Sequence, residues 1–198
     1  DIYAKLSVFD RNYPLSTFSQ EFDGQVEEYG IKSTITYNQN DFVILGADYK
    51  KSEHKNDLKQ KYNNKAIFIT NSNQLDLFGK TVITESLRSD NYDKFENKVT
   101  GKLGIKHFFR AIDGLVASLN AGSAYNAPTL YNLYDSWSGN ENLKPESTTS
   151  YDFTIGYKDI GITYFYSQTK DMIEYDYSVF KYNNIEGKSK IEGVEIEY

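Results

Sequence analysis

The chain has 198 residues, of which 39% are hydrophobic and 25% charged, so it holds enough apolar surface for a folded core. Its formal net charge of −6 argues against a nucleic-acid partner, because phosphate binding depends on a clustered positive surface. The absence of cysteine excludes disulfides, thiolate metal sites and a cysteine nucleophile.

The strands are predicted from alternation, because successive side chains of a strand point to opposite faces of a sheet. Ile31 and Ile35 share one parity, while Lys32 and Thr34 take the other. The same pattern recurs along the chain and predicts about ten strands. In chain order they span residues 2–9, 25–37, 42–51, 63–71, 79–88, 95–108, 115–126, 147–158, 162–170 and 187–198. The stretch with mixed helical spacing, residues 56–62, is too short and too charged for a stable helix.

Short and long connections follow one another between these strands. The short ones are predicted turns at residues 38–41, 71–73, 113–114 and 159–161. The long ones are rich in Asn, Asp, Lys, Ser and Tyr and lie near residues 10–24, 52–62, 88–95, 127–146 and 171–185. This alternation predicts an antiparallel up-and-down meander with its short turns at one end, as in a transmembrane β-barrel. We interpret the lysines around residues 50–61 as a solvated loop tip, with a site for anionic lipid or substrate as the alternative.

Two all-β architectures fit the alternation, namely the wall of a membrane β-barrel and a soluble β-sandwich with one solvated face. No segment has the long apolar run of a membrane-spanning helix, and the first residues do not resemble a signal peptide, which excludes a helical membrane protein. Aromatic residues gather near predicted strand ends, for example Phe108, Tyr125 and Tyr157, as in the interfacial girdles of barrels. Alternation alone does not decide between the two architectures.

A stretch in the second half of the chain resembles a known family. Residues 122–134, with Ala-Pro-Thr-Leu at 127–130, precede a Gly-Asn-x-x-Leu-Lys-Pro-Glu pattern at 139–146. Together they resemble the β-barrel of TonB-dependent outer-membrane receptors. Strand-like segments at 150–157 and 162–173, and then 182–185 together with 193–197, follow in family order, so the resemblance covers residues 122–197. Residues 1–121 add compatible alternation.

The motif residues also have structural reasons of their own. Pro128 lacks an N–H and suits a strand that leaves the sheet, and Pro145 stiffens the return to the wall. A turn is supplied by Gly139 and Asn140. We therefore expect the motif to identify the wall rather than a binding site. Its structural residues are Pro128, Gly139, Asn140, Leu143, Pro145, Glu146 and Gly193.

The resemblance implies a receptor in the bacterial outer membrane that contacts membrane lipid and takes up a metal chelate, such as a ferric siderophore or cobalamin. It also implies coupling to the TonB protein through an amino-terminal part that this sequence does not show. Members of the family have roughly 22 strands around a plug. We therefore expect residues 1–198 to form a single β-barrel segment, without the plug and the final strands.

Loop aromatics are the best candidates for ligand contact, because they combine flat apolar area with a polar handle. The candidate ligand-binding residues are Tyr131, Tyr134, Trp137 and Asn140. A girdle or loop-packing role is the competing interpretation of each. No cofactor is implied.

The sequence gives no constellation of catalytic or metal-binding residues. His54 in a polar loop and His107 near a strand end lack partners for a transition-metal site, so we expect surface histidines. No phosphate loop or nucleophile motif is present. Four acids near one break match no calcium-binding loop, and we interpret them as a solvated acidic rim: Asp135, Glu141, Glu146 and Asp152.

Four hypotheses follow. The leading one is an outer-membrane receptor, and the alternatives are a passive porin-like barrel and a soluble β-sandwich binding module. An enzyme is the weakest, because no residue pattern supports it.

Overall fold

The strands form one antiparallel meander. The computed structural model describes residues 1–14, 19–55 and 59–198. Ten strands build a single sheet in the order β1-β2-β3-β4-β5-β6-β7-β8-β9-β12, and two more form a separate hairpin. The sheet strands are β1 (Ile2–Pro14), β2 (Ser19–Thr36), β3 (Phe42–His54), β4 (Lys61–Asp76), β5 (Gly79–Tyr92), β6 (Lys98–Phe109), β7 (Leu115–Asn126), β8 (Glu146–Tyr157), β9 (Ile160–Lys170) and β12 (Lys188–Glu197). The hairpin consists of β10 (Ile173–Asp176) and β11 (Lys181–Asn184), and helix α1 spans Leu130–Tyr134.

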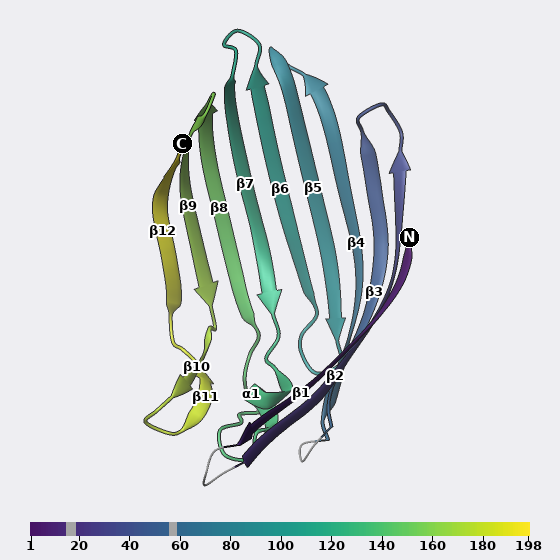
Figure 1. The fold of residues 1–198 in the computed structure, drawn as a ribbon, viewed down its shortest axis with the longest axis vertical. Coiled ribbons are helices and arrows are strands. Elements are labelled where there is room, and N and C mark those ends of the chain that lie inside the picture. The colour runs from purple at the N-terminus through teal and green to yellow at the C-terminus, as the bar shows by residue number, and fades with distance from the viewer. Residues whose placement is uncertain (15–18, 56–58) are drawn as a thin grey trace.

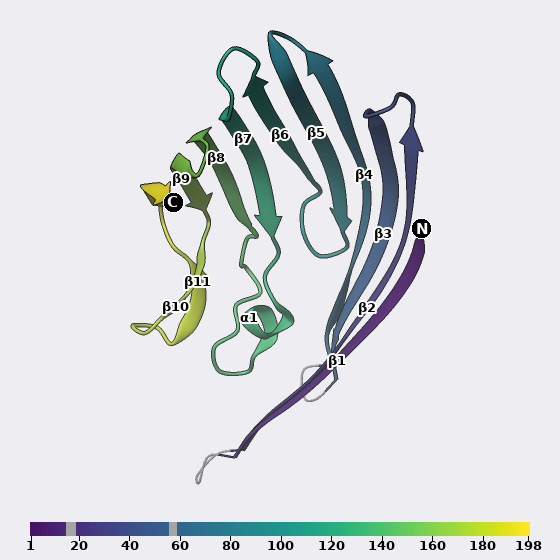
Figure 2. The same cartoon turned by 45° about the horizontal axis from the view of Figure 1, so that its top comes forward.

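The sheet curves like part of a cylinder wall (Figure 1; Figure 2), with β1 at one edge and β12 at the other. Its short turns lie together at one end of the strands. At the opposite end, which we call the loop end, α1 and the β10–β11 hairpin project from the longer connections (Figure 1). Among the described residues no second sheet packs against this one, so the β-sandwich alternative is wrong. The all-β up-and-down meander predicted from alternation is confirmed.

The register gives the sheet one apolar and one polar face. Ile31, Ala47 and Ile67 are direct partners on β2, β3 and β4, so their side chains share a face. Ile67 is 66% exposed, and exposed apolar side chains continue along this face to Val194 on β12. The opposite parity carries polar side chains, such as the hydrogen-bonded pair Thr154 and Thr163. We call these the apolar face and the polar face.

Three glycines on the polar face pack under aromatic rings of the neighbouring strand. The direct partners are Gly30 with Tyr3, Gly46 with Phe68 and Gly193 with Phe165. A Cβ added to Gly193 would stand 2.8 Å from Phe165 Cζ, so only a glycine leaves room for the ring. Glycines covered by cross-strand aromatics allow a sheet to bend while keeping the exposed backbone shielded.

The turn predicted at residues 71–73 is wrong. Here β4 continues to Asp76, and its polar residues belong to the ladder, because Asn71 donates to Glu85 over 3.0 Å. The chain reverses instead at Phe78, which has a φ of 58°, and at Gly79, with a φ of 149°. Leu77 N donates to Gly79 O over 2.9 Å and closes this turn. Asn-Ser-Asn was a misleading turn signal, since side-chain hydrogen bonds hold it inside a strand.

Several predicted connections at the loop end are shorter than expected. The strands β1, β2, β3 and β5 extend into the breaks at residues 10–24, 52–62 and 88–95. Alternation ends there because the positions of the apolar face become polar, as in the pair Gln25 and Glu53, while backbone pairing continues. Residues 15–18 and 56–58 of these predicted breaks lie outside the described residues.

The two longest connections contain structure that alternation did not indicate. Break 171–185 holds the β10–β11 hairpin, and break 127–146 holds α1. Thr129 caps α1 by accepting a hydrogen bond from Asn132 N, and the Asn132 side chain accepts one in return from Thr129 N. No helix in the described part of the chain is long and apolar enough to cross a membrane.

Candidate functional site

The β7–β8 connection has a small apolar core of its own at the loop end. Pro128 is fully buried, and three leucines on either side of the Gly139–Asn140 turn are also buried: Leu130, Leu133 and Leu143. Burying side chains of this size stabilises a folded segment by about 1.5–3 kcal/mol each. The connection is therefore an ordered platform rather than a loose loop.

Gly139 permits the close packing of this platform. A Cβ at this position would stand 2.5 Å from Asp135 O, 2.6 Å from Asp135 N and 2.8 Å from Leu133 O. These are backbone atoms, which cannot swing away as a side chain would. The Asp135 side chain in turn accepts hydrogen bonds from the N–H and the hydroxyl of Ser138. This acid therefore shapes a turn, where the sequence suggested a solvated rim.

Asn140 joins the platform to the β10–β11 hairpin. Its Nδ2 donates to Tyr182 O and to Asn183 Oδ1, both over 2.9 Å. From the hairpin side, Tyr182 N donates to Ser138 O over 2.9 Å. The Asn140 amide is thus occupied by contacts within the protein, which gives this residue a structural role. Its part in ligand binding stays a prediction.

Glu146 and Lys144 add a second connection to the hairpin. Lys144 N donates to Asn184 Oδ1 over 2.8 Å, and Ile173 N donates to Glu146 Oε1 over the same distance. Glu146 Oε2 also accepts from Asn126 across the β7–β8 pair. Glu146 therefore holds the start of β8, the end of β7 and the hairpin together.

The candidate ligand-binding aromatics divide into packed and exposed residues. Tyr131 meets Tyr182 edge to face, with ring centroids 6.0 Å apart, and Tyr134 is half-buried. Trp137 is 86% exposed, so its indole is open to a ligand from solution. Tyr131 and Asn140 thus both contact Tyr182 of the hairpin, whereas Trp137 lies at the surface. Ligand contact by each of them stays a prediction.

The hairpin contributes aromatic rings that the sequence reasoning did not select. Tyr175 packs edge to face against Tyr177 and Tyr182, at 4.9 and 5.4 Å between centroids. Burial, with Tyr131 and Asp135 nearby, raises the pKa of the Tyr182 hydroxyl above its ordinary value, so it stays a neutral donor at physiological pH. The spacing of Ile173 and Tyr175 by two residues was a strand signal that could have revealed this hairpin.

A cavity of about 320 Å³ lies between α1 and the ends of β2, β3 and β4. Leu130 and Tyr131 line it from α1, and Tyr62 and His54 line it from the sheet. His54 is only 8% exposed, so the expectation of a surface histidine is wrong. Its Nδ1 has no hydrogen-bond partner among the described residues. The α1 segment therefore reaches across the concave side to β3, which is four strands away from β7 in the sheet.

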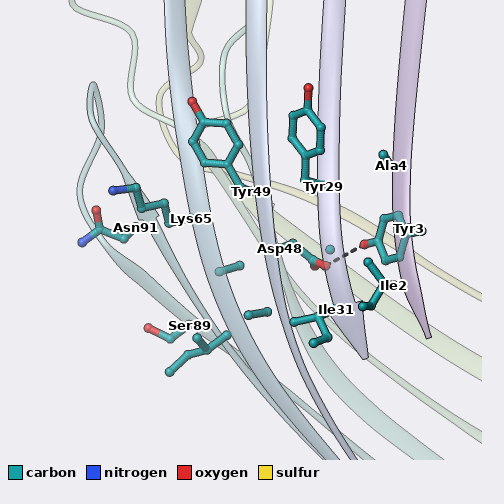
Figure 3. Close-up of a pocket in the computed structure, with 14 residues that line it drawn as sticks. Ile2, Tyr3, Ala4, Tyr29, Ile31, Asp48, Tyr49, Lys65, Ser89 and Asn91 are labelled. Carbon is teal, nitrogen blue, oxygen red and sulfur yellow. Dashed lines mark hydrogen bonds between the residues drawn. The ribbon is translucent and has the colours of Figure 1, made fainter. Parts of the chain in front are cut away.

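A second recess, of about 490 Å³, lies on the polar face below this end of the strands. Arg88 is its centre, because its guanidinium contacts Asp48 over 2.8 Å and Asp90 over 3.0 Å. Asp48 also accepts from Tyr3 over 2.6 Å (Figure 3), and Asp90 accepts from Asn64 over 3.1 Å. Each carboxylate thus has two partners, so the recess is a hydrogen-bonded polar surface.

Aromatic rings stand beside the recess at the loop end. Tyr92 is within 6.2 Å of Tyr62, 5.8 Å of Phe95 and 5.7 Å of Tyr125, measured between ring centroids. Lys98 Nζ lies 5.6 Å from the Tyr125 ring. The loop end therefore offers flat apolar rings next to hydrogen-bonding groups, the combination that holds large ligands in protein pockets.

Comparison with known proteins identifies the family. The family model described as "TonB dependent receptor-like, beta-barrel" matches residues 3–198. The chain belongs to this TonB-dependent receptor family. Its members are receptors and transporters rather than enzymes, and its homologues are outer-membrane β-barrels.

Curated relatives of the chain are named as vitamin B12 transporters. The BtuB protein of Vibrio cholerae is 34% identical over 119 residues, which cover 58% of this chain and 19% of that protein. The BtuB protein of Vibrio vulnificus is 30% identical over 172 residues, covering 78% of this chain and 27% of that protein. The chain thus matches about a fifth to a quarter of the length of these relatives.

Solved structures of receptors share the fold. The siderophore receptor PirA from Pseudomonas aeruginosa superposes with a TM-score of 0.76 at 20% identity, covering 98% of this chain and 44% of PirA. The hemophore receptor HasR of Serratia marcescens gives a TM-score of 0.68 at 11% identity, covering 98% and 42%. At these identities the likeness establishes the barrel-wall fold.

Proposed function

We propose that this chain is a segment of the barrel wall of an outer-membrane receptor that takes up a metal chelate, such as cobalamin or a ferric siderophore, by energy coupling through TonB. The observation that carries the proposal is the two-faced curved sheet in a chain of this family. An apolar convex band suits lipid, and a polar concave face with an ordered loop end suits a hydrated lumen. The short turns would then lie on the periplasmic side and the loop end outside the cell.

The sheet edges support the assignment as a segment. In the described sheet, β1 and β12 each pair with one neighbour, which leaves two open edges. Open edges and an exposed apolar face are aggregation hazards for an isolated sheet. Further strands that pair with β1 and β12 would close the barrel and remove both edges.

The loop end is the proposed capture surface. Trp137, the Tyr131–Tyr182 pair and the aromatic rings around Tyr92 all lie at this end. Large planar chelates bind through flat apolar contact together with a few hydrogen bonds. The BtuB relatives from the two Vibrio species are named for vitamin B12, so cobalamin is the first ligand to test, with ferric siderophores second.

The test is uptake by cells that carry the full-length receptor. Labelled cyanocobalamin and ferric siderophores are supplied separately, with and without the TonB protein. The proposal predicts saturable uptake of one chelate that is lost without TonB. Uptake that continues unchanged without TonB would instead support the passive porin-like alternative.

A pair of matched variants tests the capture surface. Trp137→Ala removes an exposed aromatic ring at the loop end, and Phe78→Ala removes one that is 93% exposed at the opposite end. We expect Trp137→Ala to weaken chelate binding by about tenfold, the effect of losing about 1.4 kcal/mol of ring contact. Phe78→Ala should leave binding unchanged. If Trp137→Ala, Phe78→Ala and the parent receptor all bind the chelate with the same affinity, Trp137 is not part of the capture surface.

A further inference from the structure

A groove of about 800 Å³ crosses the apolar face near the β1 edge (Figure 3). One of its rows of direct cross-strand partners is Ile31, Ala47 and Ile67. The next row toward the loop end contains Tyr29 and Tyr49, whose rings stack with centroids 6.4 Å apart. Because Ala47 is small, it leaves a hollow between the two isoleucines and beneath the tyrosines. The groove is therefore an apolar trough with an aromatic border.

Polarity along the groove rises toward the loop end. The Tyr49 hydroxyl donates to Asn63 Oδ1 over 2.9 Å, and the Tyr29 hydroxyl donates to Glu27 over 3.4 Å. Both hydroxyls thus bond to residues beyond the apolar band. Tyrosines with an apolar body and a wet hydroxyl are typical of the level of lipid headgroups at a membrane surface. The groove therefore has a hydrocarbon end and a headgroup end.

An unpaired cation stands at the headgroup end. Lys65 is exposed and lies directly across from Tyr49 on one side and Asn91 on the other. It has no ion-pair partner among the described residues. Lys51, one row further along the same face, contrasts with it, since its Nζ lies 2.7 Å from Glu53 and 3.6 Å from Glu27. The Lys65 ammonium can therefore bind an anion from outside the protein, whereas that of Lys51 is already paired.

We propose that this groove binds one anionic, phosphate-bearing membrane lipid. An acyl chain lies along the Ile31–Ala47–Ile67 row, and the lipid phosphate accepts hydrogen bonds from the Lys65 ammonium. Asn91 and the tyrosine row border the headgroup. The inference rests on the membrane placement in the proposed function, and it adds a specific lipid site to a face that lipid would otherwise cover without preference.

The test uses the full-length receptor in a neutral detergent. Native mass spectrometry counts bound lipid during titration with short-chain phosphatidylglycerol, and phosphatidylcholine with the same chains serves as the comparison. Lys65→Gln should weaken phosphatidylglycerol binding by about fivefold, the effect of about 1 kcal/mol per lysine at an anionic surface. Lys51→Gln makes the same change in net charge and should change binding by less than twofold.

A third variant separates the groove from the charge. Ala47→Leu fills the hollow on an exposed face, so it should reduce binding of both lipids while leaving the thermal unfolding of the receptor unchanged. Equal effects of Lys65→Gln and Lys51→Gln, or full lipid binding by Ala47→Leu, would overturn the proposal. Chelate binding by the same samples is measured in parallel. If the receptor binds its chelate but no lipid is bound in the groove, the lipid site is refuted and the proposed function stands. If cells that carry the receptor take up no chelate, the proposed function is refuted.

Discussion

The link between Asn140 and the β10–β11 hairpin is the contact on which the order of the loop end is expected to depend most. Asn140→Ala removes two donated hydrogen bonds, to Tyr182 O and Asn183 Oδ1, each 2.9 Å long. It also removes the acceptor for Asn142 N at 3.0 Å. A protein hydrogen bond contributes a net of about 0.5–1.5 kcal/mol. Because the site is only partly buried, we expect a loss of about 2 kcal/mol, or about a 30-fold rise in hairpin opening.

Hydrogen–deuterium exchange of the full-length receptor measures this opening. Peptides over Ile173–Asn184 should exchange about 30-fold faster in Asn140→Ala, since opening exposes their amides. Peptides over the central strand β6 should be unchanged. Asn142→Ala is the control, because it keeps the backbone N–H that bonds Asn140. Unchanged hairpin exchange in Asn140→Ala, or the same acceleration in both variants, would refute the assignment of Asn140 as the link.

Three further predictions concern packing and charge. Gly139→Ala places a Cβ 2.5 Å from a backbone oxygen, so the receptor should lose chelate binding by at least tenfold although its barrel unfolds at the same temperature; unaltered binding would contradict this. Gly193→Val pushes against the Phe165 ring and should lower the free energy of unfolding by about 1–3 kcal/mol, measured by denaturant titration. Arg88→Ala leaves the Asp48 and Asp90 carboxylates without their cation and should cost about 1–2 kcal/mol in the same assay, while Arg88→Lys costs less; equal stability of all three proteins would argue against the ion pairs.

The strands and their faces could be predicted because alternation is a local signal. Apolar residues at every second position placed most strands within a few residues, and the apolar and polar faces follow from the same parity. Strand ends were less predictable, because backbone pairing continues past the apolar band, where the positions of the apolar face carry polar side chains. The Gln25–Glu53 pair shows this, since neither residue carries the alternation.

The loop end could not be predicted in the same way, because long-range contacts decide it. His54 reads as a surface residue in a charged stretch, yet α1 from a distant connection buries it. The turn at Phe78 has one local sequence signal, Gly79. The Asn-Ser-Asn run at residues 71–73 is the stronger turn signal, so the turn was predicted there. The hairpin depends on Asn140, more than 40 residues away from Tyr182. The family motif did indicate which residues build the platform, although not how they contact one another.

The central claim is that one face of this sheet meets lipid while the other meets water. The chain has no cysteine, so single cysteines at residues 152 to 155 of β8 can carry spin labels in the full-length receptor, reconstituted in liposomes. Phe153 and Ile155 lie on the apolar face, and Asp152 and Thr154 lie on the polar face. We predict that labels at 153 and 155 collide with oxygen dissolved in lipid, and labels at 152 and 154 with a water-soluble nickel chelate. Equal accessibility at all four positions, or the reverse pattern, would contradict the account.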